Sequence, residues 1–341
     1  MKVVLVGAGM IEIPPKGYGA VEKHIWELSK ALQRIGVDTT ILNKVFGKRS
    51  IDEYRFALWA KNRLKKIDYD ILHLHTTGVG FVFSILKKEF VYTSHSRHWI
   101  STNTFTEKIG ALLEKKVVKK AKDVIALSPE IAALMQRDKE AVIIPNGVDT
   151  ERYKPSYKRR TGENIVCLGA VVTHKKFDLV ATAIKDLNCK LTIVGPIKDK
   201  KYSETIKKIS SNVEFTGIIP ENQMIKILSE ADIFVHPSIS EAFPMAVIEG
   251  MSCGLPIIAS DICKGQVTEG VNGFYIQTNI SDKERVKAIK EKIGLLLEDD
   301  ILRKKFSENS RKIVLEKYSW DKIAEKVKEV YKNFQSEHHN L

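Results

Sequence analysis

Two glutamates, Glu241 and Glu249, lie eight positions apart in the segment SEAFPMAVIE and are the residues of this chain best suited to chemistry. An ionised glutamate only accepts hydrogen bonds and can accept two hydroxyl hydrogens at once. We therefore expect Glu241 to hold a sugar diol and Glu249 to hold a ribose diol. The pair could instead be solvated groups of an ordinary helix, and the spacing alone does not separate the two interpretations.

The elements around these glutamates would position them. The segment lies between two strand-like runs, DIFVHP and GLPIIAS. A buried strand, a loop with one carboxylate and a helix with a second carboxylate in its first turn place both groups at the carboxyl end of a parallel sheet, where ligands bind. Pro244 suits a first helical position, so the N–H groups near Phe243, Met245 and Ala246 should face a diphosphate. One nucleotide sugar would satisfy all of these groups.

Further segments extend this pattern along the chain. In order they are PPKGYGAVEKHIWELSKAL, DILHLH, ALSPEI, IPNGVDTERYKP, HKKFDLVATAI, HPSISEAFPMAVIEGMSCGLPIIASD and YSWDKIAEKV, and they run from Pro14 to Val327. Through these segments the chain resembles the retaining family-four glycosyltransferases of the GT-B fold. The paired-glutamate block and the IPNGVD block are specific together, whereas ALSPEI or the Gly-rich loop alone would be a weak signal.

The resemblance implies an α/β fold of the GT-B type, with two Rossmann-like parallel-sheet domains facing across a cleft and a C-terminal helix crossing back to the first domain. Alternating strand-like and helical segments in both halves independently indicate parallel sheets. We place an acceptor-side domain at 1–155, a nucleotide-sugar-binding domain at 156–317, the returning helix at 318–335 and a tail at 336–341. The linker would lie at 153–162.

The resemblance also implies roles for individual residues. Lys175 would stabilise the leaving diphosphate, Glu241 would hold the transferred sugar, and His95 would contact a substrate, so these three form the catalytic set. The donor-binding set is Gly17, Gly19, Lys175, Phe243, Pro244, Met245, Ala246 and Glu249. The leaving phosphate oxygen would accept the acceptor's proton on the same face of the sugar, so we expect no metal, no cofactor and no protein nucleophile.

Two loops carry residues with turn chemistry. Gly17 and Gly19 in PPKGYGAV permit positive φ and close backbone approach before a helix, although any strand-to-helix turn can use such glycines. In IPNGVD, Asn146 and Gly147 suit a turn with positive φ, and Asp149 can accept hydrogen bonds from the next backbone amides. A purely structural role therefore explains the second loop well, and the resemblance adds that it borders the cleft.

Two short patterns resemble metal sites. His73 and His75 in DILHLH have side chains on one face of a strand that looks buried, so core packing is favoured over metal ligation. Asp68 and Asp70 form a DxD, which holds a divalent cation in metal-dependent glycosyltransferases. Because this pair precedes the strand instead of following it, we interpret it as a polar strand entry.

One position departs from the family pattern. The family usually has an arginine directly after the glycine of the first strand in the second domain and a lysine five residues beyond. Here these positions are Ala170 and Lys175. Losing one cation beside a departing diphosphate can cost roughly a hundredfold or more in rate. His174, Lys176 or a residue of the first domain could substitute.

The net charge of +13 and the pI near 9.3 indicate attraction to an anionic surface. The segment TEKIGALLEKKVVKKAKD has an apolar stripe at helical spacing beside several lysines: Ile109, Leu112, Leu113 and Val117 beside Lys115, Lys116, Lys119 and Lys120. Such a helix can lie on an anionic membrane, or it can be an ordinary surface helix with its stripe in the core. Nucleic-acid binding is not expected, because aromatic residues do not interleave the lysines.

Several features indicate the compartment. The sequence has no run of eighteen apolar residues, and VVLVGAGMI is followed by no small-residue cleavage site. The four cysteines have no CxxC spacing, which favours reduced, buried thiols. We therefore expect a cytoplasmic protein, at or near the cytoplasmic face of the membrane.

The expected function is transfer of a hexose-type sugar, with retention, from a UDP- or GDP-linked donor to a lipid-linked, glycan or small-molecule acceptor. Two alternatives stay open. A GT-B sugar-nucleotide epimerase would use the same fold without an acceptor. A non-catalytic nucleotide-sugar-binding partner subunit would explain Ala170 and the basic charge.

Overall fold

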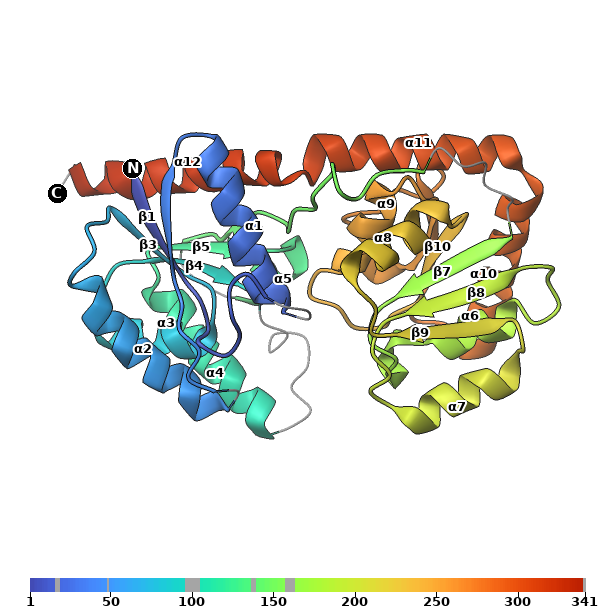
Figure 1. Ribbon diagram of the computed structural model, residues 1–341, viewed down its shortest axis with the longest axis horizontal. Coiled ribbons are helices and arrows are strands. Elements are labelled where there is room, and N and C mark those ends of the chain that lie inside the picture. Colours follow the sequence, from blue (N-terminus) through green and yellow to red (C-terminus); the bar gives the residue numbers. More distant parts are fainter. Residues whose placement is uncertain (16–18, 48, 96–104, 136–138, 157–162, 340–341) are drawn as a thin grey trace. The chain divides into compact units, whose positions relative to one another are not determined.

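The computed structural model describes residues 1–15, 19–47, 49–95, 105–135, 139–156 and 163–339. The chain divides into two compact units, each with its own core (Figure 1). The first comprises Met1–Gly147 together with Trp320–Leu341, and the second comprises Val148–Ser319. Within the described residues each unit is built on one six-stranded parallel sheet, so the expected pair of Rossmann-like sheets is confirmed.

The first unit alternates strands and helices. Its elements are β1 (Lys2–Val6), α1 (Ala20–Arg34), β2 (Asp38–Leu42), α2 (Ser50–Leu64), β3 (Ile71–Leu74), α3 (Thr77–Ile85), β4 (Val91–Ser94), α4 (Phe105–Lys120), β5 (Asp123–Ala126), α5 (Pro129–Leu134), β6 (Val142–Ile143) and α12 (Trp320–His339). The sheet has the order β2-β1-β3-β4-β5-β6, and every neighbouring pair is parallel. The central strands β3, β4 and β5 are buried along their whole length, as expected for strands covered by helices on both faces.

The last helix, α12, completes the core of the first unit. It packs on α1, and the two helices lie close together in Figure 1. Ile323 and Tyr331 of α12 are fully buried in the same apolar cluster as Leu28 of α1. At the helix surface, the Arg34 guanidinium donates to Asp321 Oδ1 from Nε at 2.9 Å and from Nη2 at 2.5 Å. The expected return of a C-terminal helix to the first domain is thus confirmed.

The second unit repeats the same alternation. Its elements are β7 (Asn164–Leu168), the 3₁₀ turn η2 (Thr173–Lys175), α6 (Phe177–Ala183), β8 (Lys190–Val194), α7 (Lys200–Ile209), β9 (Val213–Gly217), α8 (Glu221–Glu230), β10 (Ile233–His236), α9 (Met245–Ser252), β11 (Ile257–Ser260), the 3₁₀ turn η3 (Asp261–Cys263), β12 (Gly273–Ile276), α10 (Asp282–Glu298) and α11 (Asp300–Lys317). The strand order is β12-β11-β10-β7-β8-β9, and all pairs are parallel.

The strand order of the second sheet fixes where a ligand can bind. From β7 the chain first builds outward through β8 and β9, and then it returns to the other side of β7 with β10, β11 and β12. The order reverses between β7 and β10. In open α/β sheets the loops that leave the carboxyl ends of two such strands diverge and form the ligand crevice. The residues that follow β7 and β10 are therefore the first place to look for a site.

The cysteines and α4 bear on two further expectations. All four cysteines are buried free thiols, as expected. Of the apolar stripe on α4, Val117 is buried in the core, but Ile109 is 42% exposed and Leu112 is 62% exposed. The stripe is therefore only partly used in packing. None of the helices among the described residues has both the length and the apolar character that crossing a bilayer requires.

Candidate active site

Lys175 and Glu241 meet in the loops that leave β7 and β10. Their side chains form a hydrogen-bonded ion pair between Nζ and Oε1, and each side chain is 14% exposed. Lys175 is the last residue of η2, and Glu241 lies in the loop between β10 and α9. The backbone holds the two loops together, because Ile239 N donates to His174 O at 3.0 Å. The structure thus brings together two of the three expected catalytic residues at the predicted edge of the sheet.

His236 adds a third group that the sequence analysis did not single out. It is the last residue of β10, it is fully buried, and its Nε2 lies 3.5 Å from Glu241 Oε1. This distance is at the long end for a hydrogen bond, so the contact is weak. Burial lowers the pKa of His236, and the nearby Glu241 opposes this effect only in part. The imidazole is therefore neutral at pH 7.

The surroundings keep Glu241 ionised. Burial by itself would raise the pKa of this carboxyl, but the neighbouring His236 and the positive charge of Lys175 together hold the pKa well below its usual range. An ionised carboxylate is an acceptor for hydroxyl groups. The site therefore has a cation and a hydrogen-bond acceptor in direct contact, and this is the combination that a sugar diphosphate needs.

Two glycines let the backbone pack closely beside Lys175. Gly169, which follows β7, has φ +147°, and a Cβ at this residue would lie 3.4 Å from Lys175 Nζ. Gly195, which follows β8, has φ +140°, and a Cβ there would lie only 2.3 Å from Gly169 O. Residues that carry a side chain rarely adopt these backbone φ values, so glycine is required at both positions. Their close approach positions the loop that carries Lys175.

Helix α9 starts one residue later than the sequence suggested. Pro244, expected at the first helical position, has φ −75° and ψ 94° and precedes the helix, which begins at Met245. Glu249 was expected in the first turn, but it is the fifth residue of α9 and lies in the second turn, so that expectation was wrong. Met245 and the three residues after it already complete the first turn. Phe243, Met245 and Ala246 are partly buried and pack against the core.

Glu249 lies close to Tyr153 in the second unit. Its side chain is nearly buried, with 8% exposure. Burial first, and then the charges of Glu249 and Glu221, raise the pKa of Tyr153 far above its usual range. The Tyr153 hydroxyl donates to Glu221 Oε1 at 2.9 Å. That Glu249 binds a ribose stays a prediction, as do the donor-binding roles of its neighbours.

Lys176 and a buried arginine, Arg285, both bind the carboxylate of Asp282. Lys176, a candidate to replace the usual arginine, donates from Nζ to Asp282 Oδ2 at 2.8 Å. The same carboxylate accepts from Arg285 Nη1 at 3.1 Å. Arg285 is buried and donates from Nη2 to Pro237 O at 2.8 Å, directly after β10. Sequence reasoning missed Arg285, because it lies in α10, far from every motif.

In the first unit, histidines gather where β3 and β4 end. His75 and His95 directly follow these strands, and His75 Nδ1 lies 3.2 Å from His95 Nε2. The ring of His24, from α1, has its centroid 4.5 Å from that of His95. His24 escaped the sequence analysis because it looks like a core position of an amphipathic helix. His73 instead bonds Tyr331 Oη through Nδ1 and Thr93 Oγ1 through Nε2, both at 2.7 Å, which confirms its packing role.

The expectation for the Gly-rich loop can be compared with the structure at only one of its two glycines. Gly17 lies outside the described residues. Gly19 has φ −179°, which is ordinary extended backbone, so it does not use the positive φ that glycine permits. The physical reason for glycine is space, because a Cβ would lie 3.0 Å from Glu22 Oε2 and 3.2 Å from Pro15 Cβ.

The IPNGVD loop also differs from the expectation. Asn146 and Gly147 do not adopt positive φ. A Cβ at Gly147 would lie 2.6 Å from Trp320 Cδ2, so this glycine is needed for close contact with α12. Asp149 behaves as predicted, because its Oδ1 accepts from Glu151 N and Arg152 N, both at 3.1 Å.

The DxD pair lies where β3 begins, as expected of a polar strand entry. Asp68 Oδ2 is 2.5 Å from Lys2 Nζ, and Asp70 Oδ2 accepts from Lys2 N at 2.7 Å. These carboxylates therefore join the starts of β1 and β3, at the edge of the sheet opposite to the histidines.

Comparison with known proteins agrees with this architecture. The chain matches Glycosyltransferase Family 4 over residues 19–152 and Glycosyl transferases group 1 over residues 149–313. It is 21% identical to a phosphatidyl-myo-inositol mannosyltransferase of Mycobacterium tuberculosis, and the alignment, 375 positions long with its gaps, covers 97% of this chain and 96% of that protein.

Solved structures show the same fold. The sucrose-phosphate synthase of Thermosynechococcus elongatus has a TM-score of 0.81 at 18% identity and covers 98% of this chain and 99% of that chain. HepE of Anabaena in complex with UDP-glucose has a TM-score of 0.77 at 17% identity and covers 98% and 100%. The architecture is therefore GT-B, and the two family matches together span most of the sequence. The chain belongs to the group 1, family 4 glycosyltransferases, which use nucleotide-sugar donors.

Proposed function

We propose that this protein transfers a hexose-type sugar, with retention, from a UDP- or GDP-linked donor, and that its second unit holds the donor. The observation that carries the proposal is the contact of Lys175 with Glu241 at the ends of β7 and β10. A cation suits a diphosphate, an ionised carboxylate suits sugar hydroxyls, and the strand order reverses between these strands.

In this proposal the ion pair opens when the donor binds. Lys175 Nζ turns to the diphosphate and stabilises the charge that develops as the sugar–phosphate bond breaks. Glu241 then accepts hydrogen bonds from sugar hydroxyls. The N–H groups of Phe243, Met245 and Ala246, on either side of Pro244 at the start of α9, add their partial positive charge to the diphosphate site.

The bonds balance without a protein nucleophile. The bond between the anomeric carbon and the phosphate oxygen breaks, and a bond from the acceptor oxygen to the same carbon forms on the same face. The proton of the acceptor hydroxyl goes to the departing phosphate oxygen. The protein contributes position and electrostatic stabilisation, and no metal takes part in this step.

Glu249 and His95 have supporting roles in the proposal. Glu249, nearly buried on α9, accepts hydrogen bonds from the ribose diol of the nucleotide. His95 follows β4 in the first unit and is half-buried, so its imidazole can exchange a hydrogen bond with a substrate hydroxyl. Gly17 and Gly19 would let the first Gly-rich loop approach phosphate oxygens closely.

The acceptor belongs to the first unit in this proposal, and a lipid is one candidate class. The mycobacterial relative is named for transfer to a phosphatidyl-myo-inositol. On α4, exposed Ile109 and Leu112 lie near exposed Lys115 and Lys116. Apolar side chains beside lysines favour adsorption to an anionic bilayer surface. The protein would then work in the cytoplasm, at the membrane face.

A donor screen tests the function. UDP- and GDP-linked hexoses are added to the protein one at a time and its melting temperature is measured, and each donor that raises it is then assayed with lipid, glycan and small soluble acceptors. We expect one nucleotide family to raise the melting temperature and one acceptor class to release the nucleoside diphosphate. No stabilisation by any donor would contradict the proposal.

Vesicle sedimentation tests the membrane part separately. Wild type should co-sediment with phosphatidylglycerol vesicles at low salt and much less with phosphatidylcholine vesicles. Replacing Ile109 and Leu112 together by serine should weaken binding, whereas replacing exposed Leu315 of α11 by serine should not. Equal sedimentation with both vesicle types would argue against an anionic membrane partner.

A further inference from the structure

We infer that His24, His75 and His95 form a binding site for a transition-metal ion, with Zn²⁺ as the best match. One ring nitrogen from each of the three imidazoles lies within 4.8 Å of the others. The ligands come from three separate elements of the first unit: α1, the end of β3 and the end of β4. This site is separate from the Lys175–Glu241 pair, which belongs to the second unit.

The spacing suits a tetrahedral ion. With Zn–N bonds of about 2.0–2.1 Å, two ligand nitrogens lie roughly 3.4 Å apart. The His75 Nδ1 to His95 Nε2 distance is 3.2 Å. The ring of His24 has its centroid 4.5 Å from that of His95 and 5.4 Å from that of His75. Small side-chain rotations would therefore bring the third nitrogen to the same ion.

Asn146 fixes the ring of His24 in the way that the rings of metal-binding histidines are commonly fixed. Its Oδ1 lies 2.7 Å from His24 Nδ1, and an amide oxygen can only accept, so Nδ1 carries the proton. The lone pair is then on His24 Nε2. Metal-binding histidines usually donate their other ring N–H to such a fixed acceptor. Asn146 therefore orients the ring and selects the tautomer that can bind a metal.

One buried nitrogen of this cluster that is free to bind an ion lacks a partner among the described residues. It is His24 Nε2, and His24 is only 7% exposed. A buried polar atom without a partner costs free energy, so it indicates a group that something else satisfies. The neighbouring His73 is a contrast, because both of its ring nitrogens are hydrogen-bonded to hydroxyls.

Three imidazoles leave a fourth tetrahedral position for water or a substrate oxygen. If His95 also contacts a substrate hydroxyl, as in the proposed function, the ion and that substrate compete for one imidazole. Zn²⁺ should then inhibit transfer and a chelator should restore it. The metal site itself is tested without turnover, so its failure and a failure of the proposed function are distinguishable.

The test measures binding of Zn²⁺ and Co²⁺ to the full-length chain. His338 and His339 are first replaced by alanine, so that the terminal histidines add no binding. We expect about one ion per chain and the visible absorption of tetrahedral Co²⁺. His24→Gln and His95→Gln should each lose the Co²⁺ spectrum, and Asn146→Ala should weaken Zn²⁺ binding by about 10–100-fold.

His174→Gln, in the second unit, is the matched control and should bind the ion as before. Circular dichroism and melting in chelator establish that each variant is folded. Half-buried His95 provides a second ligand variant if the His24 replacement does not fold. Unchanged binding in a folded His24 or His95 variant, or no binding by the parent protein, would overturn the inference.

Discussion

Lys175 Nζ donates a hydrogen bond to Glu241 Oε1, although 66 positions separate the two residues in the sequence. Both side chains are mostly buried, so each charge depends on the other for stabilisation. A diphosphate can replace the carboxylate as the partner of Lys175, and sugar hydroxyls can replace the ammonium as partners of Glu241. A nucleotide sugar can therefore give both side chains new partners in place of each other.

Replacing Lys175 by alanine should slow sugar transfer strongly. In the proposed function the variant loses the cation beside the leaving diphosphate, and removing one such donor typically costs about 100–1,000-fold in kcat. Initial rates with a saturating donor measure this effect. Because Lys175→Ala leaves Glu241 largely buried without its counter-charge, circular dichroism and a melting curve establish that the variant is folded before rates are compared.

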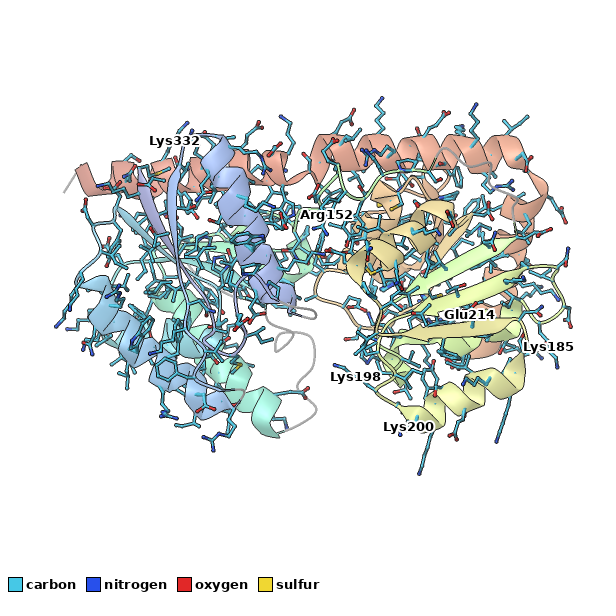
Figure 2. All side chains as sticks on the ribbon, in the orientation of Figure 1. Arg152, Lys185, Lys198, Lys200, Glu214 and Lys332 are labelled. Carbon is cyan, nitrogen blue, oxygen red and sulfur yellow. The ribbon has the colours of Figure 1, made fainter. Side chains whose placement is uncertain are left out.

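Lys185→Ala is the matched control, because Lys185 is exposed and its side chain points away from the ribbon of the second unit (Figure 2). Its rate should stay within about twofold of wild type, since a lone surface charge contributes little. A Lys175→Ala enzyme as fast as the Lys185→Ala enzyme would remove Lys175 from the mechanism.

Replacing His236 by phenylalanine should move the acid limb of the pH–rate profile to higher pH. In the proposed function Glu241 must be ionised to accept sugar hydroxyls, and His236 helps to hold its pKa low. Without His236 this pKa rises, so the carboxylate is protonated earlier as the pH falls. kcat/KM measured as a function of pH gives the shift, and a purely structural role would lower the rate equally at every pH.

Acid should destabilise the fold through buried neutral histidines. Burial lowers the pKa of His73 from 6.5 to about 3. Between these values only the unfolded state binds this proton, so stability falls as the pH falls, by about 1.4 kcal/mol per pH unit. Urea unfolding at pH 7 and pH 5 in chelator should therefore show a smaller pH dependence for His73→Gln than for wild type. Equal pH dependence would contradict this assignment.

Gly147→Ala should destabilise the first unit by about 1–3 kcal/mol, because the added methyl group overlaps the Trp320 ring. Urea unfolding followed by tryptophan fluorescence measures the loss. Gly294→Ala in α10 is the control and should stabilise the protein. Its Cβ would meet open space, and alanine favours a helix over glycine by roughly 0.5–1 kcal/mol. Equal stability of the Gly147 variant and wild type would show that the loop and α12 can separate without cost.

The sequence predicted the sheets well because their strands are short apolar runs between turn residues. DIFVHP and GLPIIAS became β10 and β11, which lie side by side as a parallel pair. The sequence indicated that Lys175 and Glu241 share one ligand site. It did not predict that the two side chains touch, because the family pattern gives residues but no distances. The return of α12 was predicted from the resemblance.

The parts that were missed depend on contacts between distant segments. His236 and Arg285 look like a strand end and a surface helix residue, and only packing around β10 brings them to the site. His24 is 122 positions from Asn146, so no local pattern shows their contact. Gly147 was interpreted through φ, whereas its actual constraint is the space beside Trp320.

Calorimetric titration of two ligands into three proteins tests the central claim most directly. Wild type, Lys175→Ala and Glu241→Gln are each titrated with the free nucleoside diphosphate and with its sugar conjugate. The account predicts that Lys175→Ala loses affinity for both ligands, whereas Glu241→Gln loses affinity only for the conjugate, because Glu241 contacts the sugar. Glu214→Gln, an exposed residue of β9 labelled in Figure 2, should match wild type. Wild-type affinity of both site variants for both ligands would contradict the account.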